Sequence, residues 1–104
     1  MVDKAELPEG LELVGFDLAD GVYTDVIYKE LTNFALKTQK LINPLEIKFH
    51  LRKLRDTGKP LYSLDGKIVA GGKILDANVE GYGLMDLIQE VMNKLETQVM
   101  KLRR

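Results

Sequence analysis

The chain has 104 residues, 45% of them hydrophobic and 30% charged, with a formal net charge of −1. This length suits one domain with one core, and the composition is that of a globular protein and excludes a disordered tail. The absence of cysteine excludes disulfides, thiolate metal sites and a cysteine nucleophile. No apolar run reaches the roughly 18 residues of a membrane span, and the acidic start has no apolar signal core, so we expect a cytoplasmic protein.

Positive charge is unevenly distributed along the chain. The first 25 residues contain seven acids and a single base, Lys4. The stretch 48–59 has the opposite balance, with Asp56 as its one acid. Its basic or titratable residues are Lys48, His50, Arg52, Lys53, Arg55 and Lys59. Clustered positive charge is typical of a surface that binds phosphate, although solvated strand charges give the same pattern.

The first ten residues end in Leu-Pro-Glu-Gly and are predicted to be a flexible lead to one domain that spans 11–104. A short strand is expected over Leu11–Leu18, with an interruption at Gly15. After this strand, Asp20-Gly21 predicts a turn.

Between Thr24 and Ile42, apolar residues recur at steps of three and four, which predicts an amphipathic helix. Either Thr24 or Asp25 is expected to cap its first turn with a side-chain oxygen. Asn43-Pro44 is expected to end the helix, because the residue before proline avoids helical backbone angles. The lysines that fall off the apolar stripe are Lys29, Lys37 and Lys40.

Residues 45–52 carry the clearest strand pattern, because Leu, Ile, Phe and Leu alternate there with Glu, Lys, His and Arg. Such a strand buries one face and turns the other toward solvent. It therefore places Lys48, His50 and Arg52 in one row, about 6–7 Å apart. A basic connection, 53–59, is expected to follow.

Two more strands are expected at Leu61–Val69 and Ile74–Glu80. Two dipeptides, Asp65-Gly66 and Gly71-Gly72, are candidate hairpin turns between them. We favour Gly71-Gly72, because it leaves two strands of useful length and makes Gly66 a β-bulge.

Gly81-Tyr82-Gly83 breaks the strand pattern and precedes a long amphipathic helix, expected from Leu84 to Leu102. Free N–H groups at this helix start can take an anion, but a structural turn is the preferred interpretation. Acids near the start and Lys101 near the end agree with the helix dipole. Lys94 lies between them.

The predicted order is thus strand, helix, three strands, helix. Two amphipathic helices need a common surface for their apolar stripes, and a four-stranded sheet offers one. The sequence therefore predicts an α+β fold, β-α-β-β-β-α, in which both helices cover one sheet face and the other face meets solvent.

The chain offers little for catalysis. His50 is its one histidine, so a two-histidine metal site is excluded and a triad would need partners that the sequence does not place beside it. Glycine–lysine pairs at Gly66 and Gly72 lack the spacing of a P-loop. The helical methionines Met85, Met92 and Met100 are interpreted as core residues that fill gaps. We therefore expect that the protein is not an enzyme and that it binds no metal, cofactor or small-molecule substrate.

Taken in order, these elements resemble the short ribosome hibernation-promoting factors and ribosome-associated inhibitors, over about residues 11–104. The resemblance rests on the element order, on Gly15 after the apolar residues of the first strand, and on Thr24-Asp25 at the first helix. The best local match is GGKILDANVE at 71–80, followed after a short break by LMDLIQEVMNKLE at 84–96. In that family a glycine-rich turn, a strand and a helix with a similar end stand in this order.

The resemblance implies a fold like that of double-stranded RNA-binding domains and a cytoplasmic, stress-related regulator of translation. Its partner would be the ribosomal RNA of the small subunit, in the channel for messenger and transfer RNA, and the protein would be a monomer or weak dimer. Family members carry bases on their helices, which correspond here to Lys29, Lys37, Lys40, Lys94 and Lys101. This chain departs from that pattern, because its densest basic row lies on the second strand and the loop after it.

Three alternatives remain open from the sequence. A module of the double-stranded RNA-binding type usually has a lysine cluster at the start of its last helix, where this chain has Gly83-Leu84-Met85-Asp86. A non-catalytic α+β domain for protein interaction or oligomerisation would use the sheet face of Lys48, His50 and Arg52. An enzyme is the third alternative.

Overall fold

The computed structural model describes residues 7–16, 21–44 and 46–102, with the backbone alone at 21–24. Its elements are β1 (Leu11–Val14), α1 (Gly21–Ile42), β2 (Glu46–Arg55), β3 (Leu61–Ala70), β4 (Lys73–Gly81) and α2 (Leu84–Leu102). The predicted order β-α-β-β-β-α is confirmed.

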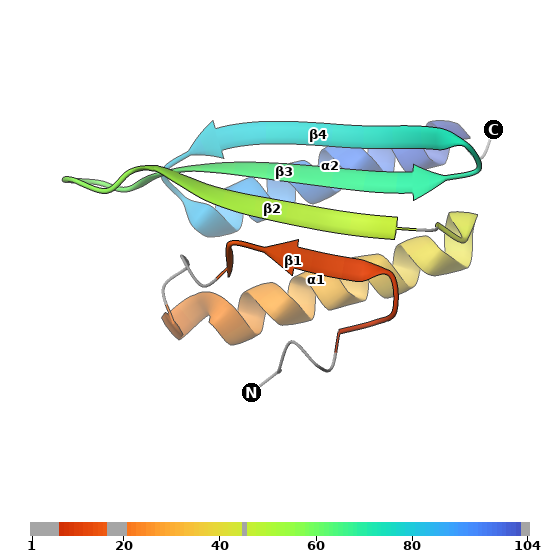
Figure 1. The fold of residues 1–104 in the computed structure, drawn as a ribbon, viewed down its shortest axis with the longest axis horizontal. Coiled ribbons are helices and arrows are strands. Elements are labelled where there is room, and N and C mark those ends of the chain that lie inside the picture. The colour runs from red at the N-terminus through yellow and green to blue at the C-terminus, as the bar shows by residue number, and fades with distance from the viewer. Residues whose placement is uncertain (1–6, 17–20, 45, 103–104) are drawn as a thin grey trace.

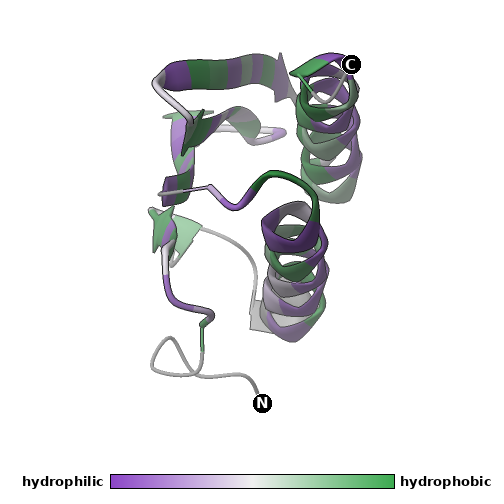
Figure 2. Ribbon diagram, turned by 90° about the vertical axis from the view of Figure 1, so that its right-hand side faces the viewer, coloured by the Kyte–Doolittle hydropathy of each residue, from purple (hydrophilic) through white to green (hydrophobic). Residues whose placement is uncertain are grey.

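The four strands form one mixed sheet in the order β1-β2-β3-β4. β1 runs parallel to β2, because α1 carries the chain back before β2 begins. The other neighbours are antiparallel hairpins. Both helices lie against the same face of the sheet, so the molecule has two layers and the predicted arrangement holds (Figures 1 and 2).

The core lies between these two layers. Every second residue of β2, namely Ile47, Phe49 and Leu51, is buried against the helices. Phe49 meets Phe34 of α1 edge to face, with ring centroids 5.9 Å apart. The apolar stripe of α2 closes the core over β3 and β4, with Leu87, Ile88, Val91, Met92, Leu95 and Val99 buried.

Gly66 is not the predicted bulge. Pairing continues through it on both sides, opposite Phe49 of β2 and Ala77 of β4. The glycine is required by the helix instead: a Cβ there would lie 2.7 Å from Val91 and 2.8 Å from Leu95. The irregularity of β2 lies further along, between Lys53 and Arg55, at the end of the strand.

Three other details differ from the sequence prediction. β1 ends at Val14, because Gly15 adopts a positive φ of 80° and the turn begins there. α1 begins at Gly21, so Thr24 and Asp25 lie within the helix and neither is the N-cap. Met100 is 45% exposed and does not belong to the core, whereas Met92 is buried as expected.

Residues 1–6 of the predicted lead, and Asp20 of the predicted turn, lie outside the described residues. The last four residues of that lead contact the domain. Leu7 packs against the core, and Gln39 of α1 donates a hydrogen bond of 2.9 Å to the carbonyl of Glu9. The carbonyl of Gly10 accepts from the N–H of Ile47 at 2.8 Å.

Candidate nucleic-acid interface

The predicted basic residues fall on three separate surfaces: the open face of the sheet, the end of the β2–β3 hairpin, and the outer sides of the helices. Alternation along β2 sends Lys48, His50 and Arg52 to the open face, as expected. Acidic neighbours meet them there. The Lys48 Nζ atom lies 3.7 Å from Glu12 of β1, and an Arg52 Nη atom lies 2.8 Å from Asp65 of β3.

The strand registers explain this pairing. Lys48 lies directly opposite Glu12. Arg52 reaches Asp65 diagonally, because His50, its neighbour on the same face, lies directly opposite Asp65. As far as the row in which Arg52 pairs with Ser63 and Ser63 with Glu80, the open face presents three bases, Lys48, Arg52 and Lys67, and five acids, Glu12, Glu46, Asp65, Asp76 and Glu80. The row that is basic in the sequence is therefore part of a mixed surface with an excess of acid.

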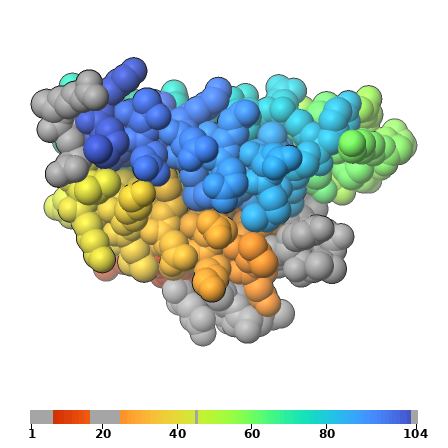
Figure 3. Space-filling view, turned by 180° about the vertical axis from the view of Figure 1, so that it is seen from behind, coloured from red at the N-terminus to blue at the C-terminus, as the bar shows by residue number. Residues whose placement is uncertain are grey.

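The end of the β2–β3 hairpin has a different character. Residues 54–59 are all exposed, and this end projects past both helices (Figure 3). Its cations gather on two aromatic rings. The Lys53 Nζ atom lies 5.7 Å from the ring centroid of Tyr62, and the Lys59 Nζ atom lies 5.2 Å from that of Tyr82. These distances are those of cation–π contacts.

Arg55 shares the Tyr82 ring with Lys59. Its guanidinium carbon lies 5.5 Å from the ring centroid, and its Nη2 group donates a 2.5 Å hydrogen bond to the Tyr82 hydroxyl. Lys53 is compensated by Asp56, 3.2 Å away. Arg55 and Lys59 form no ion pair with any residue that the structure describes. The hairpin thus carries two uncompensated cations on one exposed tyrosine.

Beside this cluster is a hollow of about 360 Å³ between the hairpin and the start of α2. Its lining residues are Pro60, Tyr62, Tyr82, Gly83, Leu84, Met85 and Asp86. The aromatic and aliphatic side chains form an open apolar surface, and Asp86 is the one acid among these lining residues.

On α1, the lysines Lys29, Lys37 and Lys40 lie along one exposed stripe, because they are spaced by eight and three residues. Lys37 is bridged to Glu96 of α2 at 3.2 Å, which links the two helices. Within the described part of the chain, Lys29 and Lys40 form no ion pair.

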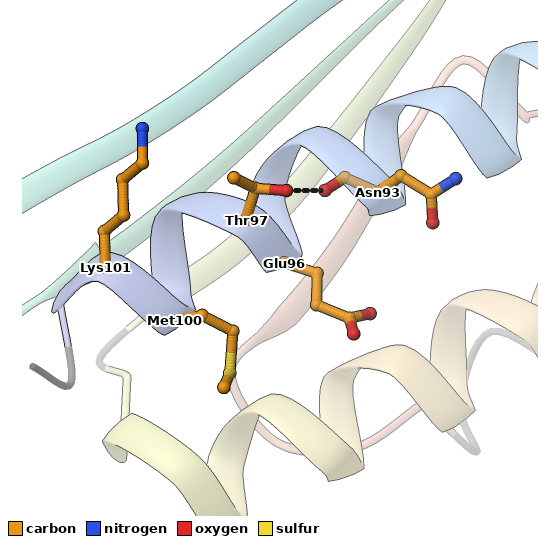
Figure 4. Close-up of a pocket in the computed structure, with 5 residues that line it drawn as sticks. All are labelled: Asn93, Glu96, Thr97, Met100 and Lys101. Atoms are coloured by element: carbon orange, nitrogen blue, oxygen red, sulfur yellow. Dashed lines mark hydrogen bonds between the residues drawn. The ribbon is translucent and has the colours of Figure 1, made fainter.

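On α2, Lys94 and Lys101 lie away from the groove between the helices. Lys94 lines a hollow beside β4 with Asp76 and Asn78. Figure 4 shows Lys101 pointing away from Glu96 and Met100, which point toward α1. The helical lysines are therefore dispersed, and the hairpin is where the structure brings cations together.

The sequence pattern indicates the hairpin cations but not the two tyrosines that hold them. The sequence predicts only a turn around Tyr82. An aromatic residue between two glycines is nevertheless a signal that could have indicated a residue in contact with a ligand. Among the described residues, no cluster of three His, Cys, Asp or Glu side chains has a geometry that could hold a metal ion. None of the described helices is long and apolar enough to cross a membrane.

The fold is shared with a protein of known structure. A ribosomal subunit interface protein from Coxiella burnetii superposes with a TM-score of 0.51 and 22% sequence identity, over 89% of this chain and 96% of that chain. A scan against family models gives no match, and neither does a search among curated proteins. The likeness establishes a common α+β fold over nearly the full length of both chains.

Proposed function

We propose that this protein is a non-enzymatic, ribosome-associated factor that binds ribosomal RNA in the small-subunit channel for messenger and transfer RNA. The observation that carries the proposal is the fold shared with a ribosomal subunit interface protein. The resemblance of GGKILDANVE and of the following helix to hibernation factors agrees with it. Such a role places the protein in the cytoplasm, as a regulator that holds idle ribosomes inactive under stress.

The mechanism needs no chemistry beyond charge and bulk. Lysine and arginine side chains neutralise RNA phosphates and release their counterions, while the domain occupies space that the usual ligands require. We assign the main contacts to those predicted RNA-binding cations that form no ion pair with the described residues: Arg55, Lys59, Lys29, Lys40, Lys94 and Lys101. Lys53 and Lys37, each with one acidic neighbour, contribute less. Lys48, His50 and Arg52 form the weakest candidate surface, because acids surround them.

Co-sedimentation with purified small ribosomal subunits over a series of salt concentrations tests the proposal. We expect the logarithm of the binding constant to fall linearly with the logarithm of salt, by roughly 0.7–0.9 for each phosphate contact. An unrelated protein of similar size and net charge is the control for trapping in the pellet. If the protein stays in the supernatant at low salt, the proposal is wrong.

A second candidate function is a protein-interaction or oligomerisation domain that uses the open sheet face. The observation that favours it is Ile74, which is 65% exposed and lies opposite Val69 on that face. Sedimentation equilibrium distinguishes this candidate: a stable dimer that Ile74→Glu converts to monomer would support it. A monomer at all accessible concentrations would exclude self-association.

A further inference from the structure

We propose that the hairpin end and Tyr82 form a binding site for one nucleotide of single-stranded RNA, with its phosphate at Arg55 and Lys59 and its base in the adjoining hollow. This inference rests on the proposed function and names the surface and the chemical groups that it uses.

Like charges converge at the hairpin end. Arg55 and Lys59 both lie within 5.5 Å of the Tyr82 ring centroid, and neither has an acidic partner among the described residues. Two cations on one ring repel each other, and the ring quadrupole offsets only part of that repulsion. An anion bound beside Arg55 and Lys59 would offset the remaining repulsion between them. A phosphodiester suits this place, since it accepts several hydrogen bonds from guanidinium and ammonium groups.

Tyr82 holds this arrangement before any ligand arrives. Its hydroxyl accepts the 2.5 Å hydrogen bond from Arg55, and its ring stands beside both cations. Tyr82 is 44% exposed, which leaves aromatic surface for a ligand. Long cationic side chains lose conformational entropy when they bind, so a shared anchor reduces that cost.

The hollow beside the ring offers a place for the base. Pro60 and Tyr62 form its hairpin side, Tyr82 comes from the connection between β4 and α2, and Leu84 and Met85 form its helix side. Its volume of about 360 Å³ and its apolar lining suit an uncharged base, and bases stack on tyrosine rings whatever their sequence.

Asp86 gives the bound nucleotide a direction. Its carboxylate lines the hollow from α2 and would repel a phosphate, whereas the hairpin side carries the two cations. The phosphate therefore lies toward the hairpin and the base toward the helix. An extended single strand satisfies this geometry, because its bases are free to turn out of a stack.

The test measures binding of a fluorescently labelled oligouridine by anisotropy, together with pelleting on small ribosomal subunits. For Arg55→Gln with Lys59→Gln, we expect weaker oligouridine binding and a salt slope reduced by about 0.7 for each phosphate that is no longer neutralised. The matched control, Lys67→Gln with Lys73→Gln, removes the same charge from the sheet and its far turn and should keep the wild-type slope.

Tyr82→Leu leaves the charge unchanged but removes the ring, and should weaken oligouridine binding by about 5- to 150-fold, the range for one stacked base. Tyr82→Phe keeps the ring and should retain most of the affinity. Thermal unfolding of each variant shows whether the domain is intact, and the glutamine pair at Arg55 and Lys59 still tests the site if the leucine variant fails to fold.

The outcomes separate the two proposals. Oligouridine binding that depends on Arg55, Lys59 and Tyr82, without pelleting on subunits, would support the site and refute the ribosomal role. Subunit binding that the hairpin variants leave equal to the control would overturn the site and keep the ribosomal role. Binding to neither probe overturns both.

Discussion

At the scale of single residues, two glycines show how close packing sets the identity of a position. Gly15 has a positive φ, and a Cβ there would overlap the carbonyl oxygen of Leu51. Gly66 has ordinary strand geometry but lies under α2, against Val91 and Leu95. Neither requirement is visible in the local sequence, because each arises from a segment distant in the chain.

Gly66→Ala should lower the free energy of unfolding by about 1–3 kcal/mol, because the added methyl group overpacks the core beneath α2. Urea unfolding followed by circular dichroism measures this change. Gly83→Ala is the control, since the group that its Cβ meets is the exposed carboxylate of Asp86, which can move away. The double variant Gly66→Ala with Val91→Ala should recover part of the stability. Equal stability of Gly66→Ala and wild type would contradict the close approach of α2.

At the scale of elements, β2 has two functional parts that the sequence presents as one basic segment. Along the sheet, its bases face acids supplied by β1 and β3. Toward the hairpin end, its bases contact tyrosines from β3 and from the β4–α2 connection. The division falls between Arg52 and Lys53, just before the irregular register between Lys53 and Arg55. Whether a base of β2 is free to bind a phosphate therefore depends on whether a neighbouring strand places an acid beside it.

Neutralising the strand row with Lys48→Gln and Arg52→Gln should change affinity for small ribosomal subunits by no more than about twofold, because acids already compensate these charges. Neutralising Lys94 and Lys101 removes the same charge from α2 and should weaken binding clearly and reduce the salt slope. Co-sedimentation compares the two pairs directly. A larger effect from the strand pair would place the open sheet face against RNA.

At the scale of the whole molecule, both helices and all four strands contribute to one continuous core. Leu31 of α1 and Leu95 of α2 are fully buried within it, although 64 residues separate them in the sequence. A single shared core predicts that the domain unfolds as one cooperative unit, as single domains of this size usually do.

Leu31→Ala and Leu95→Ala should each lower the free energy of unfolding by about 2–5 kcal/mol through the cavity that each leaves. Unfolding in urea, followed by circular dichroism and by tyrosine fluorescence, should give coincident transitions for each variant. As a control for two-state behaviour, the slope of the free energy of unfolding against urea concentration should be the same for each variant as for the wild type. Separate transitions for the two probes would mean that one helix unfolds independently.

Local sequence patterns predict the order of elements, the turn at Gly71-Gly72 and most of the core, and they lack the spacing of a P-loop. These features follow from local periodicity and turn chemistry, which a single segment carries. Other features exist only in the folded protein. These are the ion pairs that compensate the strand charges, the close approach of α2 that requires glycine at position 66, and the contact of Arg55 and Lys59 with the ring of Tyr82. These contacts depend on strand register and helix placement, which bring together residues that are distant in the chain.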